Sequence, residues 1–301
     1  MLTGIAAGLA AGALWGLVFV APRMLGGLSA VDFTVGRFLS FGALSCVLML
    51  TARKAAWPDL AQARAALCMS VLGFTGYYLL LVFAIRDAGT EVPSLIIGTI
   101  PIWMMLLGKP AGLRLGALVP GLLLTLLGLG LMAQASNGVA IDSSGAVLSG
   151  AHFWRGVAFA MAALVFWTAF GLLNAAWLKR HPEVTATAWA NWLGVATGVG
   201  ALLLWAVAGS EVNALLAQPN RAQAAMLCIA TGVGSAWAAT ILWNIASQRL
   251  STSLCGQLIL SETIFALLYS YAWDGRWPTA MQVSACVLFV LGILASIRAH
   301  R

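Results

Sequence analysis

The sequence consists almost entirely of long apolar runs separated by short charged or Pro- and Gly-containing breaks. A helix needs about 20 mostly apolar residues to cross the hydrocarbon core of a bilayer. Ten runs meet this requirement, near residues 2–21, 30–51, 65–85, 91–108, 115–134, 155–178, 185–208, 222–246, 252–272 and 278–298. Because the longest intervening segment is only residues 135–152, no separate soluble domain fits. The sequence predicts an all-α polytopic membrane protein with ten transmembrane helices.

Composition supports this fold class and limits the partners. Hydrophobic residues make up 61% of the chain and charged residues 8%, whereas soluble domains carry about 25% charged residues. The net charge of +7 would suggest nucleic acid in a soluble chain, but here it indicates cytoplasmic loops beside a lipid bilayer. The five cysteines lie in apolar runs and are read as small buried hydrophobic residues, with no disulfide, metal or cofactor predicted. The first run lacks a basic region before it, so we interpret it as a mature helix rather than a signal peptide.

The distribution of basic residues predicts the orientation, since Lys and Arg are enriched in cytoplasmic loops. Ten lie on the N-terminal side of the membrane: Arg53, Lys54, Arg64, Lys109, Arg114, Lys179, Arg180, Arg249, Arg298 and Arg301. Five lie on the other side: Arg23, Arg86, Arg155, Arg221 and Arg276. Both termini are therefore expected in the cytoplasm.

A weak internal repeat divides the chain into two five-helix halves. Shifting the sequence by 162 residues aligns 84–103 with 246–265, with identities at Ala84/Ala246, Thr90/Thr252, Ile97/Ile259 and Ile102/Ile264. Five helices is an odd number, so repeated halves would have inverted topology, the architecture of alternating-access transporters. The expected units are residues 1–134, a periplasmic linker 135–153, and residues 154–301. Chance similarity between apolar helices is the alternative.

Three further stretches resemble one known family. They are "ALWGLVFVAPR" (13–23), "ALVFWTAFGLL" (163–173) and "TILWNIASQRLSTS" (240–253). In order and spacing they are similar to the drug/metabolite transporter superfamily, in its EamA-type ten-helix branch. The stretch 118–132 and the Trp243–Asn244 pair most resemble the YddG-type exporters of amino acids, including aromatic ones. The proline that this family has in its fourth helix is Pro101 here. At the corresponding position of the ninth helix this sequence has Thr263. The residue before it, Glu262, is an acid, which is not typical of the family.

Two charged residues lie within predicted helices. Glu262 is near the centre of the ninth run, and Arg37 is about two turns into the second. A charge at a helix centre costs roughly 2.5–3.5 kcal/mol on insertion scales, so it normally faces a cavity or a partner. The sequence leaves three roles open for Glu262: a charge pair with Arg37, a protonated acid that carries a coupling proton, or a ligand for a substrate amine.

Polar and aromatic side chains follow helical spacing on several runs. Ser253, Gln257 and Ser261 form a stripe on the ninth run, and comparable patches occur on the third, fourth, sixth and eighth. We expect them to line a shared cavity; packing and interhelical hydrogen bonds are the alternative. The candidate substrate-binding residues are Trp15, Tyr77, Tyr78, Thr99, Trp167, Trp237, Gln257, Ser261 and Glu262. Gly8, Gly12 and Gly16 form GxxxGxxxG, which is typical of close helix packing.

The sequence lacks HExxH, a phosphate-binding loop with its lysine, and GxSxG. An enzyme is therefore not predicted. The resemblance implies a secondary transporter of the inner membrane that exports small metabolites, most simply amino acids, by alternating access. The alternatives are a drug or nucleotide-sugar carrier of the same fold, and a non-transporting scaffold or channel. The sequence gives no oligomeric state.

Overall fold

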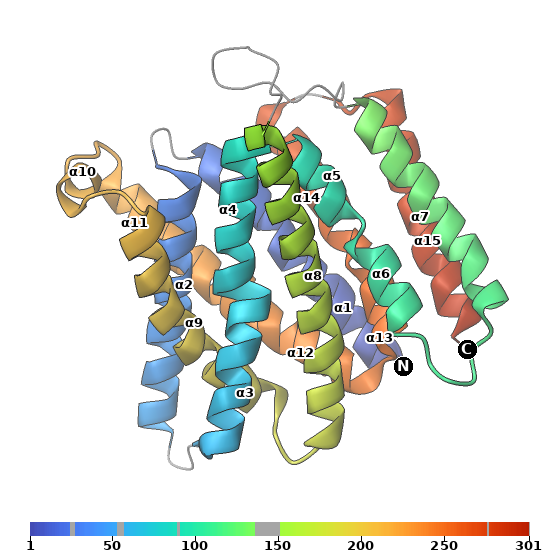
Figure 1. The fold of residues 1–301 in the computed structure, drawn as a ribbon, viewed down its shortest axis with the longest axis horizontal. Coiled ribbons are helices and arrows are strands. Elements are labelled where there is room, and N and C mark those ends of the chain that lie inside the picture. The colour runs from blue at the N-terminus through green and yellow to red at the C-terminus, as the bar shows by residue number, and fades with distance from the viewer. Residues whose placement is uncertain (25–27, 53–56, 89–90, 136–150, 276, 301) are drawn as a thin grey trace.

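The computed structural model describes residues 1–24, 28–52, 57–88, 91–135, 151–275 and 277–300. The N-terminal half contains α1 (Leu2–Gly16) with the 3-10 turns η1 (Leu17–Phe19) and η2 (Ala21–Met24), α2 (Ala30–Thr51), α3 (Leu60–Ser70), α4 (Gly76–Ala88), α5 (Glu91–Gly98), α6 (Ile100–Leu107) and α7 (Leu115–Ala135). The C-terminal half contains α8 (Ala151–Arg180), α9 (Ala186–Ala208), α10 (Val212–Leu216), α11 (Arg221–Thr231), α12 (Ala239–Arg249), α13 (Thr252–Leu258), α14 (Leu260–Asp274) and α15 (Ala280–Ala299). Figure 1 shows their arrangement.

Each of the ten apolar runs is helical. Among the residues that the structure describes, eight helical spans are long and apolar enough to cross a membrane, and two shorter apolar helices, Leu2–Gly16 and Ile96–Leu107, correspond to the first and fourth runs. The prediction of an all-α polytopic membrane protein is therefore confirmed. Residues 136–150, most of the expected linker, lie outside the described residues, and α8 already begins at Ala151.

Polar side chains at the ends of the runs start the helices. Ser29 accepts a hydrogen bond from the Asp32 backbone N–H at 3.0 Å at the start of α2, and Thr185 accepts one from Ala188 at 3.1 Å at the start of α9. Asp59 with Gln62, and Thr279 with Gln282, form capping boxes at α3 and α15. These contacts satisfy backbone N–H groups that have no partner within the helix.

Two irregularities recur in both halves. A π-helical segment, Val71–Thr75, joins α3 to α4, and another, Gly232–Ala238, joins α11 to α12. Adding 162 to 71–75 gives 233–237, inside the second segment. The fourth run breaks at Thr99 and the ninth at Ile259; since 99 plus 162 is 261, the two breaks lie two residues apart under the same shift. Pro101 contributes to the first break because it lacks an N–H. The π-helical segments and the breaks thus lie at similar positions in the two halves, and the repeat itself stays a prediction.

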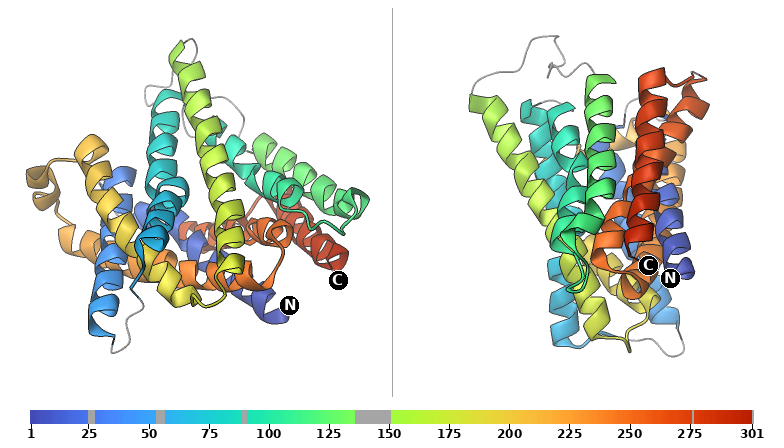
Figure 2. Two further views of the ribbon diagram at one scale, coloured as in Figure 1. Left: turned by 60° about the horizontal axis from the view of Figure 1, so that its bottom comes forward. Right: turned by 90° about the vertical axis from the view of Figure 1, so that its right-hand side faces the viewer.

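The contacts between the halves also follow a two-fold relationship. Corresponding runs pack on one another: α2 on α9, α7 on α15, and the fourth run on the ninth through α6 and α13. Contacts between different runs also occur in corresponding pairs, since α4 packs on α8 as α12 packs on α1, and α6 packs on α8 as α14 packs on α1. Figures 1 and 2 show α7 and α15 side by side at one edge of the bundle, and both termini near the same end. We call this end the terminal end, and the opposite end, where α7 finishes and α8 begins, the linker end.

Small residues allow the closest helix contacts. A Cβ atom on Gly8 would lie 2.7 Å from a side-chain atom of Leu258, and one on Gly16 would lie 2.8 Å from the Ala266 backbone nitrogen. A Cβ atom on Gly12 would overlap the Ser261 hydroxyl. The GxxxGxxxG sequence thus packs α1 against α13 and α14, as its packing interpretation predicted.

Candidate functional site

Three tryptophans from three helices meet in the interior. The Trp15 ring on α1 lies 5.3 Å from that of Trp243 on α12 and 6.4 Å from that of Trp167 on α8, and the last two are 6.1 Å apart. Trp243 is fully buried, whereas Trp15 and Trp167 retain partial exposure. We call these residues the tryptophan cluster. Ile96 and Ile97 of α5 pack on the same core, which brings the break at Thr99 close to it.

A path of aromatic rings connects this cluster to α2 and α4. Phe170 lies 6.0 Å from Trp167, and Phe74 lies 5.6 Å from Phe170. Phe38 on α2 is 5.9 Å from Phe74 and 6.4 Å from Tyr78. These centroid separations are typical of interacting aromatic pairs. The path crosses from the C-terminal half to the N-terminal half.

Four polar side chains gather at the far end of this path. Arg37 on α2 interacts electrostatically with Glu262 on α14 and with Tyr77 and Tyr78 on α4. The Arg37 guanidinium lies 4.9 Å from the Phe38 ring centroid, a cation–π distance. The Tyr78 hydroxyl donates to the Ala30 carbonyl at 2.7 Å. We call these four residues the charged group.

Arg37 and Glu262 attract each other without a direct ion pair. Within the described ranges, no salt bridge joins them, and the buried Nε of Arg37 has no hydrogen-bond partner. Both side chains have intermediate exposure. Such an arrangement leaves charge inside the membrane only partly compensated, which usually marks a functional site.

Glu262 faces away from the outer side of its helix. A groove of about 320 Å³ between α14 and α15 is lined only by apolar residues and Tyr271. Tyr271 is nine residues after Glu262, which is about 180° around a helix of 3.6 residues per turn. Glu262 is therefore directed toward the interior and α2.

The terminal end is closed by the two interrupted helices. The Ser253 backbone N–H of α13 donates to the Gly108 carbonyl, just after α6, at 3.1 Å. A Cβ atom on Gly256 would lie only 2.5 Å from a side-chain atom of Met104. Beyond the breaks, α5 packs on α8 and α14 on α1. The two interrupted helices thus meet at the terminal end and take different partners toward the linker end.

The polar stripe on the ninth run does not line an open cavity in this structure. Gln257 is fully buried and donates through Nε2 to the Thr125 hydroxyl of α7 at 3.0 Å. Ser261, 1% exposed, donates to the Leu258 carbonyl at 2.7 Å beside Gly12. Trp237 keeps partial exposure and donates to Asn191 on α9 at 2.8 Å. Gln257 and Trp237 therefore make interhelical hydrogen bonds, which was the alternative to a shared cavity. Such bonds satisfy polar side chains inside a membrane, because lipid offers them no partner.

The stripes on the sixth and eighth runs are sealed as well. Asn174 on α8 donates to Asn244 on α12 at 3.2 Å and accepts from the Trp189 indole N–H at 2.7 Å. All three side chains are fully buried. The polar patches are therefore of two kinds. Some hold neighbouring helices together by hydrogen bonds, and the other is the charged group.

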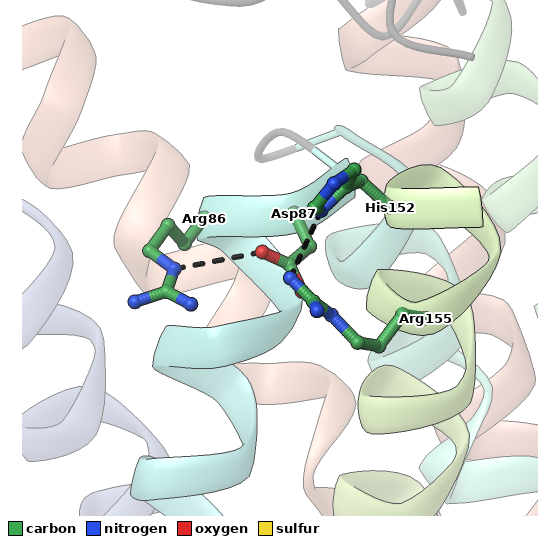
Figure 3. A network of polar contacts seen from close by, with 4 residues as sticks. All are labelled: Arg86, Asp87, His152 and Arg155. Atoms are coloured by element: carbon green, nitrogen blue, oxygen red, sulfur yellow. Dashed lines mark hydrogen bonds and ion pairs between the residues drawn. The ribbon is translucent and has the colours of Figure 1, made fainter. Parts of the chain in front are cut away.

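At the linker end, an acidic residue ties the two halves together. Figure 3 shows Asp87, at the end of α4, between Arg155 at 2.6 Å and Arg86 at 3.5 Å, with His152 3.0 Å from Arg155. A second tie joins Asp32 to Ser210, whose backbone N–H and hydroxyl donate at 2.8 and 2.7 Å. In the part of the chain with described positions, no cluster of three or more His, Cys, Asp or Glu side chains could hold a metal ion.

Sequence reasoning missed Phe38, Phe74 and Phe170 in the aromatic path and did not include Trp243 among the site residues. Phe170 follows Trp167 by three residues and so lies on the same helix face, a usable signal. Phe38 and Phe74 carry no such signal, because an apolar aromatic residue in an apolar helix looks the same at lipid-facing and interior positions.

The comparisons with known proteins agree with this architecture. Residues 154–298 match the model of the EamA-like transporter family. The chain is 29% identical to "Inner membrane protein YtfF" of Escherichia coli (strain K12), over 99% of this chain and 96% of that protein. A solved crystal structure with 22% identity covers 99% of both chains with a TM-score of 0.75, which shows a common fold.

The apolar helices, the match to the EamA-like transporter family and the similarity to an inner membrane protein support a multi-pass membrane transporter. The C-terminal half carries an EamA-like domain, and together with the similarity to YtfF over nearly the whole chain it supports membership of the drug/metabolite transporter superfamily.

Proposed function

We propose that this transporter exports small metabolites, most simply amino acids including aromatic ones, by alternating access without ATP. The observation that carries the proposal is the position of the charged group. An arginine from one half and a glutamate from the other lie inside the membrane, joined by aromatic rings to the tryptophan cluster. Amino acids present charges of both signs and, when aromatic, a ring that stacks on such a surface.

The helix arrangement supports a cycle between two states. Contacts between α6 and α13 close the terminal end, while α5 and α14 have separate partners toward the linker end. With the termini in the cytoplasm, as the basic residues predict, the end joined by α6 and α13 is the cytoplasmic one. The opposite state would exchange these contacts between the inverted halves.

Transport into proteoliposomes tests the proposal directly. Purified protein in vesicles preloaded with unlabelled amino acids should accumulate the same radiolabelled amino acids by exchange, whereas protein-free vesicles should not. Comparison with and without a pH gradient separates facilitated from proton-coupled movement. Absence of exchange for every amino acid, together with exchange of a drug or a nucleotide sugar, would replace the amino-acid assignment by that alternative.

A further inference from the structure

We propose that Arg37 and Glu262 hold a zwitterionic substrate between them, with Arg37 binding its carboxylate and Glu262 its ammonium group. This inference rests on the proposed function and specifies how its site selects substrates. It assigns opposite ends of one ligand to residues of opposite halves.

The spacing of the two charges is the first argument. A buried acid and a buried base that touch each other compensate most of their desolvation cost, and a third charged group then gains little. Arg37 and Glu262 are near enough to interact but form no direct ion pair in the described structure. A ligand with one positive and one negative group would complete both contacts at once.

The surroundings of Arg37 are suited to a carboxylate. The Phe38 ring, 4.9 Å away, supports the guanidinium, and the buried Nε–H has no acceptor among the described residues. A guanidinium with a free Nε–H and Nη–H edge binds a carboxylate through two parallel hydrogen bonds. The unpaired edge of the Arg37 guanidinium therefore favours a carboxylate as its ligand group.

The surroundings of Glu262 are suited to an ammonium group. Its side chain is directed to the interior, and over the described residues no hydrogen bond reaches its carboxylate. Tyr77 interacts with it electrostatically from α4 and offers an oxygen to the same ligand group. An ammonium donates three hydrogen bonds and carries the charge that neutralises the carboxylate.

The location on two halves links recognition to transport. Arg37 belongs to α2 of the N-terminal half, and Glu262 to α14 of the C-terminal half. A zwitterion bridges both halves, whereas an amine or an acid alone engages only one. The difference in binding between states is what drives a conformational change, so molecules with one charge should be poorly transported.

Three compounds with the same ring test this division: phenylalanine, phenethylamine and 3-phenylpropionate. The assay measures exchange of radiolabelled phenylalanine in proteoliposomes and its inhibition by each compound. Wild type should exchange phenylalanine. The two single-charge compounds should inhibit this exchange at least about tenfold more weakly than unlabelled phenylalanine does, because a charged hydrogen bond contributes about 1.5–3 kcal/mol. Glu262→Gln and Arg37→Gln should each lower phenylalanine affinity about tenfold or more.

The two variants should differ in selectivity. Glu262→Gln should lose less affinity for 3-phenylpropionate than for phenylalanine, and Arg37→Gln should lose less for phenethylamine. If Arg37→Gln does not fold, Arg37→Lys replaces it in the same assay. This variant keeps the positive charge but lacks the planar guanidinium that binds a carboxylate through two parallel hydrogen bonds. The exposed Glu183→Gln and Arg180→Gln serve as matched controls, with melting temperature and size-exclusion profile as folding checks.

Equal effects on all three compounds in folded protein would overturn the inference while leaving amino-acid transport intact. Glu262→Gln protein that keeps its exchange and selectivity, but no longer responds to a pH gradient, would make Glu262 a proton site instead. Wild-type protein that exchanges no amino acid would remove the proposed function and this inference together.

Discussion

Asn174 on α8 donates a hydrogen bond to Asn244 on α12 at 3.2 Å, at a point where both side chains are fully buried. The same Asn174 side chain accepts from the Trp189 indole N–H at 2.7 Å. Three helices of the C-terminal half are thus connected through one amide. In a bilayer no water replaces these partners, so the group stabilises the packing of α8, α9 and α12.

Replacing Asn174 by Leu should destabilise the protein. The substitution removes both hydrogen bonds and leaves the buried Trp189 N–H without an acceptor, which costs about 1–3 kcal/mol. The melting temperature in detergent measures the loss. Asn213→Leu, at an exposed position of α10, is the matched control and should leave melting unchanged. An unchanged melting temperature for Asn174→Leu would show that the amide is dispensable.

Replacing Gly12 by Leu should separate α1 from α14. A Cβ atom there would overlap the Ser261 hydroxyl and lie 3.0 Å from the Glu262 backbone nitrogen. Forced overpacking of this kind costs about 1–3 kcal/mol, so both melting temperature and amino-acid exchange should fall. Gly130→Leu is the control, because a Cβ atom on Gly130 meets nothing within 4 Å. Equal behaviour of the two variants would contradict the packing role of the GxxxGxxxG sequence.

Gln257 should affect stability but not substrate affinity. Its amide bonds Thr125 on α7 rather than an open cavity. Gln257→Leu alone leaves the buried Thr125 hydroxyl without that donor, whereas Gln257→Leu with Thr125→Val replaces both partners and should be closer to wild type in melting temperature. KM for exchange should stay within about twofold in each variant, in contrast to Glu262→Gln. A large rise in KM would return Gln257 to the substrate site.

The Asp87–Arg155 contact should contribute modestly to stability. The Arg155 side chain is 48% exposed, and ion pairs with an exposed partner contribute about 0–1 kcal/mol. A double-mutant cycle with Asp87→Asn and Arg155→Gln, read by thermal melting, should give a coupling energy within about this range that decreases at high salt. Coupling well above 1 kcal/mol would show that this tie holds the halves together more strongly than its exposure implies.

The apolar runs alone were sufficient to predict the helices. The second run, 30–51, has the bounds of α2, and the other nine runs coincide with helices or with pairs of helices interrupted inside the run. The reason is that lipid leaves the backbone no hydrogen-bond partner except itself, so length and apolarity specify a spanning helix. The interruptions were less predictable: Pro101 explains the break near Thr99, but no comparable residue marks Ile259.

The candidate site depended on the tertiary structure. The sequence identified Glu262, Arg37, Tyr77 and Tyr78 as polar residues inside the membrane, because such residues are costly there. It did not distinguish them from Gln257 or Asn174, which have the same helical spacing and depth. Whether a polar side chain faces a neighbouring helix or an interior space depends on which helices pack together, and that arrangement is set by contacts between residues far apart in the sequence. Composition and periodicity therefore determined the class of protein and its helices, and only the packing of α1, α2, α4, α8, α12 and α14 decided which of their side chains meet.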